Sequence, residues 1–323
     1  MNKEQVKIFH ISHDDLDGVG ALQLTKLAFS PEQILGTKPT PIKNIDKDVE
    51  KFVRTKWEKD TLFIISDLSV NEEVAKLIDK KVQEGYQVQL IDHHPTALWL
   101  METYDWATVI PENGQKTCAT QLYLNYLVEK GYLTPSSIIK DYVELVRSYD
   151  VWDWYPDNLR AKELNDLLYI IGRNSFDEFV LARLQNDSLK EETFSFGEKE
   201  VYLLEVEQTR IEKYIKQKEK ELTKVHHTID GRDYLVGVIA IENYHSETGN
   251  DLCRKEEDMD FIAMVDVGKQ KISFRTIKED VNVSLIAKFF GGGGHPKSSG
   301  CTLYEETISL FLNPIVYRKE ETE

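Results

Sequence analysis

Acidic and imidazole side chains follow four runs of apolar residues. In chain order they are His13, Asp15 and Asp17; Asp67; Asp92, His93 and His94; and Asp150. The first three groups come directly after strand-like runs, and the fourth follows a helical stretch. Because side chains alternate along an extended chain, the spacing of His13, Asp15 and Asp17 predicts that all three project to one side.

A lone Asp after a strand is most often a helix cap or a turn residue. Carboxylates and imidazoles at three strand ends need another explanation, because buried like charges repel each other and unpaired charges are costly. A divalent cation resolves this conflict. Oxygen and imidazole ligands without thiolates favour manganese, with magnesium, iron, cobalt and zinc as weaker candidates. The number of carboxylates indicates two ions that share a bridging Asp, an arrangement suited to phosphoester hydrolysis.

A glycine run near the C-terminus, in FFGGGGHPKSSG, gives a second functional signal. Glycines after a helix often form only a C-cap. However, four in a row followed by His295 favour an anion site, because backbone N–H groups without side-chain cover can bind a phosphate. We expect Gly292, Gly293, Gly294 and His295 to contact substrate. Arg275 is a candidate phosphate or base contact, although a surface salt bridge is an equal alternative.

The elements that position these residues form two α/β regions. Strand-like runs at 6–12, 61–68 and 86–92 alternate with helical patterns at 18–29 and 72–83, which predicts a mostly parallel sheet whose ligands lie at the carboxyl ends of the strands. The next region, 117–185, is mainly helical and completes a domain over 1–190.

The charged segment 191–224 predicts one long linker helix. Its near-heptad apolar residues favour a connector that packs on its own domains over a coiled-coil homodimer seam. Beyond it, strand-like runs at 234–241, 261–267 and 271–277, with helices near 248–255 and 283–290, predict a smaller mixed α/β domain over 225–323.

The composition of the chain bears on which nucleic acids it can bind and on its cellular compartment. The chain has 323 residues, with 40 Lys plus Arg against 56 Asp plus Glu and a net charge of −16, which disfavours binding to long nucleic acid. The sequence contains no apolar run long enough to span a membrane. Cys118, Cys253 and Cys301 form no disulfide or thiolate-site pattern. We therefore expect a cytoplasmic protein.

Taken together, the motifs resemble the DHH phosphoesterase superfamily in its form with a DHH-associated C-terminal domain. The matches, in family order, are HDDLDG at 13–18, IISDLS at 64–69, IDHH at 91–94, SYDVWD at 148–153 and FRTIKEDVNVSLIAKFFGGGGHPKSSG at 274–300. They span nearly the whole chain. The resemblance implies a parallel-sheet domain that binds metal, a helical linker and a substrate-binding domain, with the active site between the domains.

The resemblance also implies roles for the individual residues around two manganese ions. Asp15 and His13 would bind one ion, Asp17, His93 and Asp150 the other, and Asp67 would bridge both. Asp92 would orient His93, while His94 would face the substrate phosphate. Arg275, Gly293, Gly294 and His295 would hold the far end of the nucleotide.

One position differs from the common family pattern, and in the fourth motif two Asp residues are candidates for the same metal-binding role. Many members carry a metal-binding His four residues before the first Asp, where this sequence has Ile11, so His13 is the substitute. Asp153 is the alternative to Asp150 in the fourth motif.

The favoured activity is that of an oligoribonuclease that cuts substrates of two to five nucleotides, with overlap onto linear dinucleotides such as pApA. A bisphosphate-nucleotide phosphatase or a cyclic dinucleotide phosphodiesterase is the alternative. A RecJ-like exonuclease is disfavoured, because residues 226–323 carry 11 Lys plus Arg against 17 Asp plus Glu. A non-catalytic nucleotide-binding module is disfavoured, because the expected metal ligands are all present.

Overall fold

The computed structural model describes residues 6–111, 116–154, 157–185 and 192–317. The chain divides into two compact units, residues 1–204 and 205–323. The predicted domain boundary at 190 lies outside the described residues. Within the described ranges, no helix combines the length and apolarity needed to cross a membrane.

The first unit is built on a five-stranded sheet in which every pair of neighbouring strands is parallel, in the order β2-β1-β3-β4-β5. The strands are β1 (Lys7–Ser12), β2 (Ile34–Pro39), β3 (Thr61–Ser66), β4 (Gln87–Asp92) and β5 (Ala107–Val109). Strands β1, β3 and β4 confirm the three predicted runs. We did not predict β2 or β5, because β2 contains Gly and Pro and β5 has only three residues.

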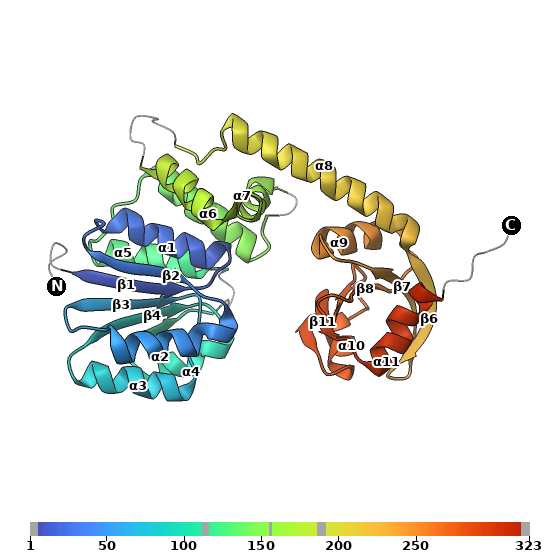
Figure 1. Ribbon diagram of the computed structural model, residues 1–323, viewed down its shortest axis with the longest axis horizontal. Helices are drawn as coiled ribbons and strands as arrows, with labels where there is room; N and C mark the ends of the chain where they lie inside the picture. Colours follow the sequence, from blue (N-terminus) through green and yellow to red (C-terminus); the bar gives the residue numbers. More distant parts are fainter. Residues whose placement is uncertain (1–5, 112–115, 155–156, 186–191, 318–323) are drawn as a thin grey trace. The chain divides into compact units, whose positions relative to one another are not determined.

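Helices cover both faces of this sheet (Figure 1). One layer contains α1 (Leu16–Ala28), α5 (Ala119–Glu129), α6 (Ser137–Asp150) and α7 (Leu159–Leu184), whose apolar residues form one core cluster with β1 and β3. The other contains α2 (Ile45–Thr55), α3 (Glu72–Gln83) and α4 (Leu98–Thr103), over a second cluster. Two short 3-10 turns, Ile42–Asn44 and Pro95–Ala97, precede α2 and α4. Because helices cover both faces of the sheet, we expect a functional site at the loops that follow the carboxyl ends of its strands.

Helix α8 (Glu198–Glu221) is shorter than the predicted helix over 191–224. Residues 192–197 are not helical, because Phe194 is buried in the core of the first unit and its backbone N–H donates to the Asp141 carboxylate. At the other end, Thr223 already begins a strand. Ile211 and Ile215 pack in a core cluster of the second unit, which agrees with the predicted connector that packs on its own domains.

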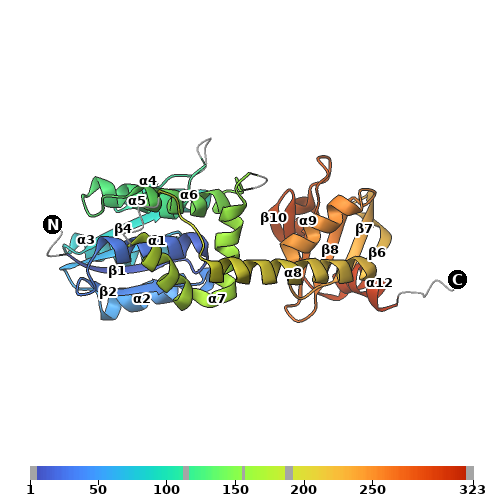
Figure 2. The same ribbon diagram turned by 90° about the horizontal axis from the view of Figure 1, so that it is seen from above.

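The second unit contains a mixed six-stranded sheet in the order β10-β11-β9-β8-β7-β6. Its strands are β6 (Thr223–Ile229), β7 (Arg232–Ala240), β8 (Phe261–Asp266), β9 (Lys271–Arg275), β10 (Gly293–His295) and β11 (Ser298–Thr302). Only β7 and β8 pair in parallel. Its helices are α9 (His245–Lys255), α10 (Val283–Phe289), α11 (Glu305–Thr307) and α12 (Asn313–Val316), with a π-helical turn over Ile308–Leu312 (Figures 1 and 2). The predicted mixed α/β fold is confirmed, although β6, β10 and β11 were missed.

Candidate metal centre

The strand register brings the predicted loops together. Ser12 of β1 pairs with Ser66 of β3, and Ser66 pairs with Ile91 of β4. The carboxyl ends of these three parallel strands are therefore aligned at the same edge of the sheet. His13, Asp67 and Asp92 are the next residues, so their convergence follows from the register.

One cluster joins the β1 and β3 loops. His13 Nδ1 lies 2.7 Å from Asp15 Oδ2 and 3.7 Å from Asp67 Oδ2. One ligand atom from each of these three side chains lies within 4.8 Å of the others, a spacing that fits a metal ion. Burial disfavours the His13 imidazolium, but the hydrogen bond and charge of Asp15 outweigh it and raise the pKa of His13.

A second cluster adds helices α1 and α6. His93 Nε2 lies 3.4 Å from Asp67 Oδ1, 3.8 Å from Asp17 Oδ2 and 3.6 Å from Asp150 Oδ2. Asp17, His93 and Asp150 form a further group with metal-ligand spacing. Asp67 therefore touches both clusters, with one carboxylate oxygen toward each.

Asp67 sits in an unfavourable environment in the absence of a cation. It is 2% exposed, and its φ of 58° places it in the left-handed region, which is uncommon for a residue with a side chain. Burial, followed by the charges of Asp17, Asp15, Asp150 and Asp92, raises the pKa of Asp67 well above its ordinary value. An ionised Asp67 thus needs a positive partner.

The chemistry of these atoms fits divalent ions. Asp67 Oδ2 and His93 Nε2 are buried and have no hydrogen-bond partner among the described residues. A buried polar atom without a partner is rare in folded proteins, and both atoms are metal-ligand types. A cation between the carboxylates would satisfy both atoms and offset the repulsion between the charges.

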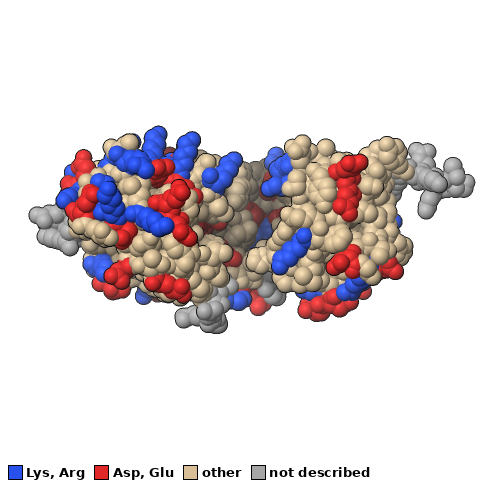
Figure 3. Space-filling view, turned by 90° about the horizontal axis from the view of Figure 1, so that it is seen from below, with Lys and Arg blue, Asp and Glu red and all other residues tan. Residues whose placement is uncertain are grey.

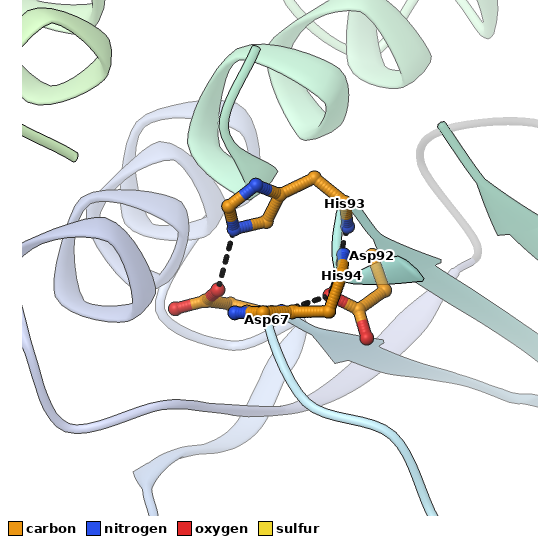
Figure 4. Close-up of side chains that lie close together, drawn as sticks. All are labelled: Asp67, Asp92, His93 and His94. Carbon is orange, nitrogen blue, oxygen red and sulfur yellow. Dashed lines mark hydrogen bonds and ion pairs between the residues drawn. The ribbon is translucent and has the colours of Figure 1, made fainter. Parts of the chain in front are cut away.

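Asp92 holds the third loop, but in a different way from our expectation. Its Oδ1 accepts a hydrogen bond from the His93 backbone N–H at 2.8 Å and contacts His94 Nδ1 at 2.8 Å, so it orients the His94 ring and not the His93 ring. Figure 4 shows the His93 ring directed at Asp67 and His94 paired with Asp92. The Asp92 hydrogen bond outweighs burial and raises the pKa of His94. The ring of His94 is half-exposed.

Helix ends explain the positions of the two Asp residues in the first motif. Asp15 is the N-cap of α1 and accepts from the Gly18 N–H at 3.0 Å. Asp17 accepts from the backbone N–H groups of Ala119 and Thr120 at the start of α5. At Gly18, a Cβ would lie 2.2 Å from the His13 carbonyl oxygen, so close backbone approach requires glycine there.

The geometry also separates the open alternatives. Ile11 is fully buried in an apolar core cluster, whereas His13 faces the carboxylates. Asp153 contacts Lys116 and Arg147, while Asp150 reaches His93. His13 and Asp150 therefore lie within the candidate clusters, whereas Ile11 and Asp153 make other contacts.

Sequence reasoning missed a buried polar network behind Asp67. His10 Nε2 lies 2.8 Å from Ser66 Oγ, and Ser66 Oγ lies 2.7 Å from Ser12 Oγ. The other ring nitrogen of His10 contacts Thr25 Oγ1 at 2.7 Å. These contacts fix the end of β3 immediately before Asp67. Polar residues within apolar strands, such as the His in KIFHIS, were the available signal.

His10 provides a pH-dependent test of this network. Burial lowers the pKa of His10 to about 3, whereas the unfolded chain titrates near 6.5. The unfolded state binds the extra proton below pH 6.5, so this contribution to stability is lost as the pH falls from 6.5 toward 3. Between pH 7 and pH 5, the free energy of unfolding should fall about 2 kcal/mol more in the wild type than in His10→Gln. Urea titrations with EDTA measure this difference; parallel pH profiles would contradict the assignment.

The second unit brings its predicted residues together on the sheet. His295 of β10 pairs with Ser298 of β11, and Ser298 pairs with Arg275 of β9. Directly opposed residues in antiparallel strands share a face, so these three side chains form a row. Arg275 Nη2 donates to Ser246 Oγ at 3.1 Å.

The glycine run has a structural role beside any binding role. A Cβ at Gly292 would lie 2.1 Å from the Gly300 carbonyl oxygen, and one at Gly294 would lie 2.6 Å from Ser299 Cα. Close packing on β11 therefore requires both glycines. Gly293 has no neighbour within 4 Å of such an atom and is exposed, as are Gly294 and His295.

The comparisons with known proteins agree with this geometry. No family model matches the chain. It is 39% identical over 314 residues to oligoribonuclease NrnB of Bacillus subtilis, which covers 94% of this chain and 75% of that protein. The chain belongs to the DHH phosphoesterase family.

Solved DHH-type structures share the fold. The DHH domain of a member of the s1p family of ribosomal proteins has a TM-score of 0.60 at 17% identity, covering 98% of this chain and 87% of that one. RecJ of Thermus thermophilus in complex with Mn²⁺ has a TM-score of 0.54 at 16% identity, covering 97% of this chain and 52% of that one. The predicted DHH fold class is thus confirmed.

Proposed function

We propose that this DHH phosphoesterase hydrolyses short oligoribonucleotides of two to five nucleotides, and linear dinucleotides such as pApA, to mononucleotides with two manganese ions. The observation that carries this proposal is the placement of Asp67 between two metal-type clusters. The 39% identical relative is an oligoribonuclease, which supports the substrate class. Each cluster supplies the oxygen and imidazole ligands that manganese accepts.

The residues have distinct tasks in this mechanism. His13, Asp15 and Asp67 would hold one ion, and Asp67, Asp17, His93 and Asp150 would hold the other. When bound, such a pair lowers the pKa of water and neutralises charge on the phosphate. His94, fixed by Asp92 and half-exposed, donates a hydrogen bond to the substrate phosphate and is the candidate proton donor.

The second unit is assigned a nucleotide-binding role of its own. Arg275 and His295 flank Ser298 on one sheet face, next to the exposed Gly293 and Gly294. Guanidinium and backbone N–H groups both suit phosphate oxygens. Arg275 and His295 therefore bind substrate, and Gly292 shapes the hairpin that carries His295.

Charge supports a limit on substrate length. Residues 226–323 carry a net charge of −6. On the face shown in Figure 3, basic and acidic side chains of the first unit are interspersed and form no continuous basic stripe. Long single strands need such a stripe. We place the enzyme in the cytoplasm, consistent with three free cysteines.

A substrate panel tests the proposal. Metal-stripped protein resupplied with manganese should convert pApA and an RNA pentamer to mononucleotides, with at least about tenfold lower kcat/KM on a DNA 20-mer because phosphate neutralisation is weak. Cyclic di-AMP and 3′-phosphoadenosine-5′-phosphate test the alternative activities. Mass spectrometry follows the products. Rapid turnover of the DNA 20-mer alone would refute the proposed substrate class.

A further inference from the structure

Helix α7 carries two side chains, Tyr169 and Arg173, that no motif singled out and that lie near the loop of the first metal cluster. Gly172 interrupts the helix with φ 74° and ψ 159°, and Tyr169 and Arg173 lie on either side of this kink. Buried Leu168 and Phe176 anchor the two halves in the core. The kink is therefore a fixed feature of the unit and determines where Tyr169 and Arg173 lie.

Arg173 reaches the loop that carries His13. Its Nη2 lies 3.8 Å from Asp14 Oδ2, and Asp14 Oδ1 lies 3.6 Å from His13 Nε2. The side chains of Arg173 and Asp14 are 40% and 33% exposed. A partly exposed pair at this distance is weak, and among the described residues the guanidinium makes no hydrogen bond. Its N–H donors thus remain available to a ligand.

Tyr169 lies on the same helix, three residues before Gly172. It is 67% exposed, a large value for an aromatic residue. Burial of the hydroxyl and the charges of Asp15 and Asp14 raise the pKa of Tyr169, so the phenol is within electrostatic range of both carboxylates. An exposed aromatic ring and a guanidinium on the same kinked helix offer one surface to a base and one group to a phosphate.

The negative charge of the candidate metal centre favours an additional cationic side chain, such as Arg173, beside an anionic substrate. Six carboxylates surround it, contributed by Asp14, Asp15, Asp17, Asp67, Asp92 and Asp150. Two divalent ions, as in the proposed function, offset four of those charges. A substrate with a second phosphate would therefore be bound more tightly if a further cation lay outside the site of the two metal ions. Arg173 is such a cation, because Asp14 and His13 lie between it and Asp67.

We propose that Arg173 and Tyr169 form a nucleotide subsite on the catalytic unit, in which Arg173 binds a phosphate adjacent to the scissile one and Tyr169 stacks on that nucleotide's base. This inference rests on the proposed function and adds a specificity: substrates with a terminal phosphate are preferred. The subsite is built by the first unit alone.

Substrates with and without the terminal phosphate test Arg173. In Arg173→Gln, KM for pApA should rise about tenfold with kcat within threefold, whereas kcat/KM for ApA should stay within threefold. Arg173→Lys should recover part of the loss. Arg54→Gln is the matched control, because Arg54 lies on α2 and pairs only with Glu50 among the described residues. Equal losses on both substrates, or no loss on pApA, would overturn the assignment.

Binding without turnover separates this inference from the proposed function. In equilibrium dialysis with manganese present, Arg173→Gln should weaken AMP binding about tenfold and leave adenosine binding unchanged. If the wild type hydrolyses neither dinucleotide, the proposed function fails while this measurement still tests Arg173. Equal AMP affinity in wild type and variant would refute the phosphate contact.

Tyr169 has its own pair of variants. Tyr169→Ala should raise KM for both pApA and ApA about fivefold, because both substrates carry the base. Tyr169→Phe, which keeps the ring, should match the wild type within twofold. An unchanged KM in Tyr169→Ala would remove the stacking contact.

Discussion

Replacing Asp67 by Asn is expected to lower the rate of pApA hydrolysis by about a thousandfold or more, because both ions lose a charged ligand. The same change should stabilise the metal-free fold. Asp67 is buried among carboxylates that raise its pKa, so its ionised form destabilises the folded state at neutral pH. Asn carries no charge and tolerates the left-handed backbone of this position. We therefore expect the free energy of unfolding in EDTA to be higher for Asp67→Asn than for the wild type.

Opposite effects on activity and stability distinguish a metal ligand from a structural residue. Rates of pApA hydrolysis and urea unfolding in EDTA measure the two effects. Asp153→Asn is the control, because Asp153 pairs with Lys116 and Arg147 and should leave the chemical step intact. Wild-type activity in Asp67→Asn would refute the bridging role, and a loss of stability in EDTA would show that the carboxylate serves the fold.

Replacing Asp17 by Ala is expected to impair both the fold and the reaction. The Asp17 carboxylate is buried and accepts two backbone N–H groups at the start of α5, at 2.7 and 2.8 Å. Without it these donors have no partner, which should cost about 2–4 kcal/mol of free energy of unfolding in EDTA. Hydrolysis of pApA should fall by about a hundredfold or more, because the second cluster loses a ligand.

The Asn variant separates the two roles of Asp17. Its amide oxygen still accepts one N–H, so Asp17→Asn should lose less stability than Asp17→Ala and remain nearly as inactive. Urea titration and steady-state kinetics on the same preparations give both quantities. An active, stable Asp17→Ala protein would contradict both roles.

The first unit was predictable to the extent that its residues carry periodic patterns. The buried strands β1, β3 and β4 were predicted because each is a run of apolar residues, and Asn71 caps α3 by accepting a hydrogen bond from the Val74 N–H. Strand order cannot be read from such patterns. The pairing of Ser12 with Ser66 that aligns the loops depends on long-range contacts.

The sequence was sufficient to predict which residues lie in the candidate metal centre, but not which side chains contact one another there. The motif residues His13, Asp67 and His93 do converge. The bond of Asp92 to His94 could not be inferred, because rotamers at adjacent positions depend on the folded loop. Likewise, Arg173 and Asp14 lie far apart in the sequence, and only the kinked path of α7 brings the two together.

Under the proposed function, Asp67 would bridge two divalent ions. Anomalous diffraction from crystals of the protein grown with manganese tests it most directly. We expect two manganese peaks, one beside His13 and Asp15 and one beside His93 and Asp150, with an Asp67 oxygen on each. A single peak, or peaks that the Asp67 carboxylate does not touch, would contradict the account.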